Sequence, residues 1–200
     1  GTLVASLGPN TPAGAGVVKT ATGRVVTQVQ LQPSLGENVT VTQVLVTHVG
    51  TATPATAVQM VRLYEDLNGN GAVNAGEPQL GTATFSGTTA TITLNRTLNA
   101  AVVHQLVVVY DLSGNGTAGQ TLAARVAAAT DVTATGVTSG LTLTVVGLPS
   151  FPLTGGTITL IDAPPTQTVT AGAQPPAAAT ETGSAPREEV SQPDLTASGE

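Results

Sequence analysis

Residues 66–77, with the sequence DLNGNGAVNAGE, have the residue types and the spacing of a calcium-binding loop. Calcium is a hard cation that takes about six to eight oxygen ligands at about 2.3–2.6 Å. Side chains that bear oxygen stand at alternate positions early in the loop and a glutamate closes it, so they can converge on one ion. The predicted ligands are Asp66, Asn68, Asn70, the carbonyl oxygen of Ala72, Asn74 directly or through water, and both carboxylate oxygens of Glu77.

The segments on either side of this loop decide which kind of calcium site it would be. VQMVRLY before the loop and QLGTATF after it are typical of strands rather than helices. We therefore expect the loop to join two strands and the ion to be structural. Only Asp66 and Glu77 among the predicted ligands are carboxylates, which favours weak affinity, roughly 10⁻⁴–10⁻³ M. Asn and Gly are also common turn residues, so a polar hairpin loop without metal is the alternative.

The segment LYEDLNGNGAVNAGEPQLG resembles the calcium loops of secreted bacterial and archaeal β-sandwich modules, including the B-type repeats of Gram-positive surface adhesins. It is similar also to dockerin loops, although dockerins need flanking helices and a second loop copy, which this chain lacks. The resemblance extends more loosely over residues 56–136. A further likeness is to the calcium-dependent, donor-strand-linked subunits of thermophile filaments and tubes (cannula-like subunits). These resemblances imply an extracellular structural or adhesive role in which calcium rigidifies the module.

The elements that must position the loop are strands. Forty percent of the chain is hydrophobic but only 2% is aromatic, and Val and Thr are abundant, which favours strands over helices. Runs of alternating or apolar residues predict strands, separated by Gly, Asn, Pro and Ser. The predicted strands are 2–7, 24–32, 38–48, 56–65, 79–86, 89–97, 101–111, 120–129, 141–147 and 157–161. This spacing predicts an all-β fold, an antiparallel immunoglobulin-like β-sandwich.

Composition divides the chain into three parts. Residues 1–22 form an extended N-terminal segment whose TLVASL stretch is a candidate donor strand for another subunit, or else the first strand of its own domain. Residues 23–162 form the sandwich. Residues 163–200 are an acidic tail rich in Pro, Thr and Ala, and we expect it to be extended.

Charge and composition exclude several partner classes. A net charge of −6 and the lack of a basic patch or stacking aromatics argue against nucleic-acid binding. No apolar run reaches the length of a membrane span. Asn38, Asn95 and Asn115 begin glycosylation sequons, so surface glycans are candidate partners.

Enzymatic chemistry has few candidate residues in this sequence. There is no cysteine, and His48 and His104 are the only histidines, each in a predicted strand. They could act together only if the fold brought them into one pocket. Asp111, Ser113 and Asn115 begin a second loop of calcium type, but no acidic residue closes it, so a tight hairpin turn is favoured there.

The sequence therefore predicts a non-enzymatic, extracellular or cell-surface structural subunit. Its calcium-stabilised sandwich would self-associate as a homopolymer into a filament, tube or surface layer, with strand donation as a candidate contact. The alternative is a monomeric calcium-stabilised spacer or ligand-binding module of a cell-surface adhesin.

Overall fold

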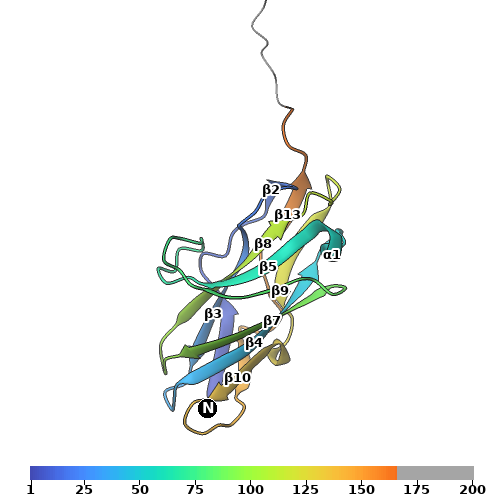
Figure 1. Cartoon of the computed structure of the whole chain (residues 1–200). Coiled ribbons are helices and arrows are strands. Elements are labelled where there is room, and N and C mark those ends of the chain that lie inside the picture. The colour runs from blue at the N-terminus through green and yellow to red at the C-terminus, as the bar shows by residue number, and fades with distance from the viewer. Residues whose placement is uncertain (166–200) are drawn as a thin grey trace, which may run out of the picture. The chain divides into compact units, whose positions relative to one another are not determined.

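Two β-sheets enclose one hydrophobic core (Figure 1). The structure is a computed structural model, and it describes residues 1–165. The first sheet has six strands in the order β11–β1–β3–β8–β5–β6. These strands are β1 (Thr2–Leu7), β3 (Arg24–Pro33), β5 (Val58–Glu65), β6 (Gln79–Ala83), β8 (His104–Leu112) and β11 (Thr144–Leu148).

The second sheet has seven strands. Its main path is β10–β4–β9–β13–β2, with β7 paired to β4 and β12 paired to β9. These strands are β2 (Ala15–Val18), β4 (Val39–Val49), β7 (Thr89–Leu98), β9 (Thr121–Val126), β10 (Val132–Gly136), β12 (Leu153–Thr154) and β13 (Ile158–Ile161). Two short helical turns complete the described part, α1 (Pro54–Ala57) and η1 (Ala129–Asp131). No helix within residues 1–165 is long and apolar enough to cross a membrane.

Strand β8 of the six-stranded sheet is buried on both of its faces. Its inward side chains, among them Leu106, Val108 and Tyr110, belong to the core between the sheets. Val107 and Val109 point to the opposite face, yet they are also buried, in a second small cluster. Other segments must therefore cover the outer face of this sheet, and the loop between β5 and β6 covers part of it through Val73, which lies beside Val109.

The prediction of an all-β sandwich is confirmed, and every predicted strand corresponds to an observed one. The sheets are mixed, however, rather than purely antiparallel. β1 pairs with β11 in parallel, and β2 pairs with β13 in parallel. Each of these pairs joins segments far apart in the sequence, so no hairpin connection imposes the antiparallel direction.

The expected boundary at residue 22 is wrong for this structure. β1 lies between β3 and β11 of the same chain, and it buries Leu3 and Ala5 completely. β2 pairs with β13 in the other sheet. The N-terminal segment therefore belongs to the sandwich, which spans Gly1–Pro164 as one compact unit. Of the predicted tail at 163–200, the part from residue 166 onward lies outside the described residues.

Candidate calcium site

The predicted calcium loop joins two neighbouring strands of the six-stranded sheet. β5 ends at Glu65 and β6 begins at Gln79, and the two strands pair in antiparallel register. The expectation that strands rather than helices flank the loop is confirmed. An ion held here would be bound to a rigid sheet edge rather than between movable helices.

Hydrogen bonds gather the first three predicted ligand side chains around the turn. The carboxylate of Asp66 accepts the backbone N–H of Asn70 at 3.1 Å through Oδ1 and that of Gly71 at 2.8 Å through Oδ2. Asn68 Oδ1 accepts the same Asn70 N–H at 3.0 Å. Asn70 Oδ1 in turn accepts the N–H of Ala72 at 2.9 Å. The Oδ1 atoms of Asp66 and Asn68 each keep a further lone pair that no loop donor uses.

Glu77 closes the loop across its width. Its Oε1 accepts the N–H of Leu67 at 3.1 Å, and its Oε2 accepts the N–H of Asn74 at 2.8 Å. The side-chain amide of Asn74 donates to Asn70 Oδ1 at 3.1 Å and to the Ala72 carbonyl at 3.4 Å. All six predicted ligand residues are thus connected in one loop.

The loop is seated on the N-terminal segment that connects β1 to β2. Gly71 has φ +75°, a conformation that favours glycine, and a Cβ at this position would clash with the carbonyl oxygen of Asn10. The side chain of Asn10 donates to the Gly69 carbonyl at 2.7 Å. Backbone therefore meets backbone at Gly71, with no room for any larger residue.

A buried glutamine on β3 holds the loop and the N-terminal segment together. Gln28 on β3 is completely buried, and its amide donates to Asp66 Oδ2 at 2.6 Å and to the Gly69 carbonyl at 3.2 Å. Its Oε1 accepts the N–H of Asn10 at 2.8 Å. One side chain therefore joins the loop, the N-terminal segment and the sheet. Nothing in the local sequence around Gln28 indicates this role.

The charge of Asp66 is the unusual feature of the site. This residue is only 2% exposed, and within residues 1–165 no Lys, Arg or His side chain forms an ion pair with it. Buried carboxylates are normally paired with a cation or bound to a metal, because desolvating a charge is costly. The three groups that donate to Asp66 are uncharged amides, and its Oδ1 keeps a lone pair, so the residues present fit a cation. Across the described chain no three His, Asp or Glu side chains group as a metal site, so amide and carbonyl oxygens would complete the shell, as calcium accepts.

A second buried carboxylate lies next to the loop but is neutralised. Glu65 Oε1 accepts a hydrogen bond from Arg96 at 2.7 Å, and His104 Nδ1 lies 3.4 Å from the same oxygen. His104 Nε2 accepts the N–H of Asn99 at 3.0 Å, which leaves Nδ1 to carry the proton and donate to Glu65. Because Arg96 is on β7 and Glu65 on β5, the ion pair ties the two sheets together at the base of the loop.

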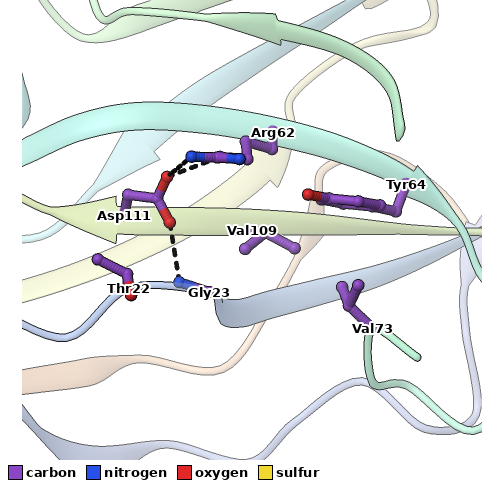
Figure 2. Close-up of a pocket in the computed structure, with 7 residues that line it drawn as sticks. All are labelled: Thr22, Gly23, Arg62, Tyr64, Val73, Val109 and Asp111. Carbon is purple, nitrogen blue, oxygen red and sulfur yellow. Dashed lines mark hydrogen bonds and ion pairs between the residues drawn. The ribbon is translucent and has the colours of Figure 1, made fainter. Parts of the chain in front are cut away.

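The outer face of the six-stranded sheet carries a small pocket beside the loop (Figure 2). Its volume is about 240 Å³, and Val73 from the loop faces Val109 and Tyr64 across it. Arg62 donates to Asp111 Oδ2 at 2.6 Å through Nε, and Gly23 N–H donates to Asp111 Oδ1 at 2.8 Å. Hydrogen bonds to Tyr64 and Asp111 raise the pKa of Arg62.

The sequence predicts a hairpin turn, rather than a second calcium loop, at Asp111, Ser113 and Asn115, where β8 ends and the next loop begins. Asp111 is already paired with Arg62, so its charge is compensated without a metal. Ser113 donates to the Thr56 carbonyl and accepts the N–H of Asn115 at 3.1 Å. The hairpin expectation is wrong, because β8 and β9 belong to different sheets and the loop crosses between them.

The two histidines lie in different sheets, His104 on β8 and His48 on β4. His48 is buried and contacts the ring of Phe85 edge-on, with ring centroids 6.2 Å apart. Burial lowers the pKa of His48 below its usual range. The sequon residues Asn38, Asn95 and Asn115 are all exposed.

The sequence matches no protein-family model and no curated protein. Among solved structures, the chain is similar to the seventh ScaB type I cohesin from Pseudobacteroides cellulosolvens, with 11% identity and a TM-score of 0.38 over 84% of this chain and 98% of that one. It is also similar to a family 123 glycoside hydrolase from Clostridium perfringens, with 8% identity and a TM-score of 0.33 over 80% of this chain and 28% of the hydrolase. Both likenesses are too distant to carry an argument about the function of this chain.

Proposed function

We propose that this chain is a non-enzymatic structural module of an extracellular or cell-surface assembly, and that calcium bound by residues 66–77 stabilises its sandwich. The observation that carries the proposal is the buried carboxylate of Asp66, which has no cationic side chain to compensate it in the described chain. A cation at the centre of the loop would supply that charge.

The ligand chemistry favours calcium over other metals. The predicted set consists of carboxylate, amide and carbonyl oxygens, without nitrogen or sulfur. Zinc, copper, iron and nickel prefer imidazole or thiolate ligands. Magnesium demands near-octahedral geometry and keeps several waters, whereas calcium accepts irregular shells that include backbone carbonyls.

The stabilisation expected from such a site is modest. An ion that binds only the folded state adds RT ln(1 + [Ca]/Kd), which is about 1.4 kcal/mol when calcium exceeds Kd tenfold. For a domain of this size, that corresponds to a rise in Tm of about 3–6 °C. A site with the predicted Kd of roughly 10⁻⁴–10⁻³ M would need about millimolar calcium to be half filled or more, so the proposal places the module outside the cell.

Self-association into a filament, tube or surface layer is the second part of the proposal. Strand donation would require β1 to leave its own sheet and enter that of a neighbouring copy. The pairing of β1 within its own chain makes one copy complete, and this observation favours the monomeric spacer as a second candidate function.

One experiment tests both parts. Thermal melts of the full chain in millimolar calcium and in chelator, with light scattering on the same samples, should show a higher Tm and a larger particle in calcium. Glu77→Gln should remove the calcium-dependent rise in Tm. Glu37→Gln is the matched control, because the Glu37 carboxylate also accepts backbone N–H groups, at 2.9 Å from Thr138 and Ser139, but outside the loop.

The outcomes separate the hypotheses. If Tm does not change with calcium, the loop is a polar turn without metal. If Tm rises but scattering reports a monomer at every concentration, the chain is a calcium-stabilised spacer and does not assemble by itself.

A further inference from the structure

The dipeptide Asn-Gly occurs twice in the predicted calcium loop, at 68–69 and 70–71, and once more in the chain, at 115–116. In such a dipeptide the backbone nitrogen of the glycine can attack the side-chain amide carbon of the asparagine, because glycine has no side chain to hinder the approach. All three asparagines are exposed, so water can reach them. The sequence gives the three dipeptides the same chemistry, and the structure distinguishes them.

Asn68 and Asn70 form the same kind of turn. Asn68 Oδ1 accepts the backbone N–H of Asn70 at 3.0 Å, and Asn70 Oδ1 accepts that of Ala72 at 2.9 Å, so each side chain bends back over the following peptide. A donor placed there also stabilises the negative charge that the amide oxygen acquires during attack. At Asn115 the backbone N–H donates to Ser113 Oγ at 3.1 Å, but within residues 1–165 no hydrogen bond holds the side chain.

The glycine nitrogens differ between the two dipeptides of the loop. The N–H of Gly71 donates to the buried Asp66 Oδ2 at 2.8 Å, so attack on Asn70 requires breaking a hydrogen bond to a carboxylate. Asn74 also donates to Asn70 Oδ1 at 3.1 Å and holds that side chain in place. The N–H of Gly69 has no acceptor in the part of the chain that the structure describes, so its nitrogen can react without this cost.

We propose that Asn68 is a site of spontaneous deamidation and that Asn70 is protected from it. The nitrogen of Gly69 forms a bond to Cγ of Asn68, its proton passes through water to the side-chain nitrogen, and that nitrogen leaves as ammonia. The product is a five-membered succinimide ring. Water then adds to one of the two ring carbonyls and opens the ring, to aspartate or to isoaspartate. The net reaction consumes one water and releases one ammonia, without oxidation or reduction.

The two products change the proposed calcium site in opposite directions. Aspartate at position 68 adds a carboxylate to those of Asp66 and Glu77, and a higher ligand charge strengthens calcium binding. Isoaspartate inserts a methylene group into the backbone of the turn and displaces the ligands that follow, which weakens binding. This consequence rests on the proposed function, whereas the reaction itself does not.

The first test follows both asparagines in the full chain, kept folded in chelator at neutral pH, by tandem mass spectrometry of the loop peptide over time. Asn68 should react at least about tenfold faster than Asn70, because only Asn70 requires the loss of a hydrogen bond to a charged acceptor. In denaturant the two rates should become similar, since both residues precede glycine and the turn is lost. Equal rates in the folded chain, faster reaction at Asn70 or no reaction at Asn68 would overturn the proposal.

The second test measures calcium binding by titration calorimetry. Asn68→Asp supplies the aspartate product and should lower the Kd by about tenfold relative to wild type. Asn115→Asp is the matched control, because it makes the same change of charge at an exposed Asn-Gly dipeptide outside the loop and should bind calcium like wild type. If none of the three proteins binds calcium, the proposed function is wrong, while the first test alone decides the deamidation. If Asn68→Asp and wild type bind equally, the inferred effect on affinity is wrong.

Discussion

Asp66 and Gly71 show how single residues define the loop. Asp66 accepts both the N–H of Gly71 and the amide of Gln28 through one oxygen. Gly71 lets the chain turn so that this is possible, with φ +75°. The residue without a side chain is thus as necessary as the carboxylate, because any Cβ at position 71 would meet the backbone of Asn10.

Substitution of Gly71 by alanine tests this contact. Gly76→Ala is the matched control, because Gly76 also has a positive φ, +90°, but has open space where a Cβ would be. The control should cost about 1–2 kcal/mol from the backbone alone. Gly71→Ala should lower the free energy of unfolding by at least about 1 kcal/mol more than the control, because the backbone of Asn10 must move away from the new Cβ. Chemical denaturation of the two variants measures the difference. Equal losses would mean that the loop does not rest on Asn10.

At the scale of elements, β3 acts as the platform for two segments at once. Gln28 connects it to Asn10, before β2, and to Asp66 and Gly69, after β5. The outer face of the sheet is buried at this point even though it faces away from the core. The loop and the N-terminal segment should therefore be stabilised together rather than independently.

Replacing Gln28 by leucine should loosen both segments. The variant leaves Asp66, Gly69 and Asn10 without their buried partner, at a cost of about 2–4 kcal/mol. Amide hydrogen exchange should increase both at 8–11 and at 66–71, and calcium should bind more weakly by titration calorimetry. Gln30→Leu, two residues along the same face of β3 and half-buried, should change neither segment. Faster exchange in only one segment would show that Gln28 does not couple them.

The sequence predicted the strands, and the position of the loop between two of them, because both are local patterns. Alternation with a period of two residues is visible in β7 or β9, and the residues that define the loop lie within twelve positions. The short strands β2, β10 and β12 and the turn α1 were missed, because segments of two to five residues are too short to establish a period.

Long-range features could not be predicted in the same way. Gln28 is separated from Asp66 by 38 positions, and Glu65 from Arg96 by 31. Which polar residues meet depends on strand order, and the parallel neighbours β1 and β11 are at opposite ends of the sandwich sequence. The sequence contains these residues but not a signal for their pairing.

At the scale of the sandwich, two sets of side chains connect the sheets. One is the ion pair between Glu65 and Arg96. The other is a series of rings in which Phe85 contacts His48 of the seven-stranded sheet at 6.2 Å and Tyr110 of the six-stranded sheet at 5.7 Å. Phe85 thus contacts a ring from each sheet, and a charge on His48 would lie directly against this contact.

Protonation of His48 should therefore destabilise the sandwich. Burial lowers the pKa of His48 in the folded state below 6.5, so the folded protein favours the neutral imidazole. The stability that this provides is fully present above pH 6.5 and is lost as the pH falls through the folded pKa. Denaturant unfolding between pH 7.5 and pH 5.0 should show this loss in wild type and a smaller loss in His48→Leu. Hydrogen bonds from Ser139 lower the pKa of Glu37, but this carboxyl is present in both proteins and contributes equally to the two profiles. Parallel pH profiles of the two proteins would show that another group governs the acid sensitivity.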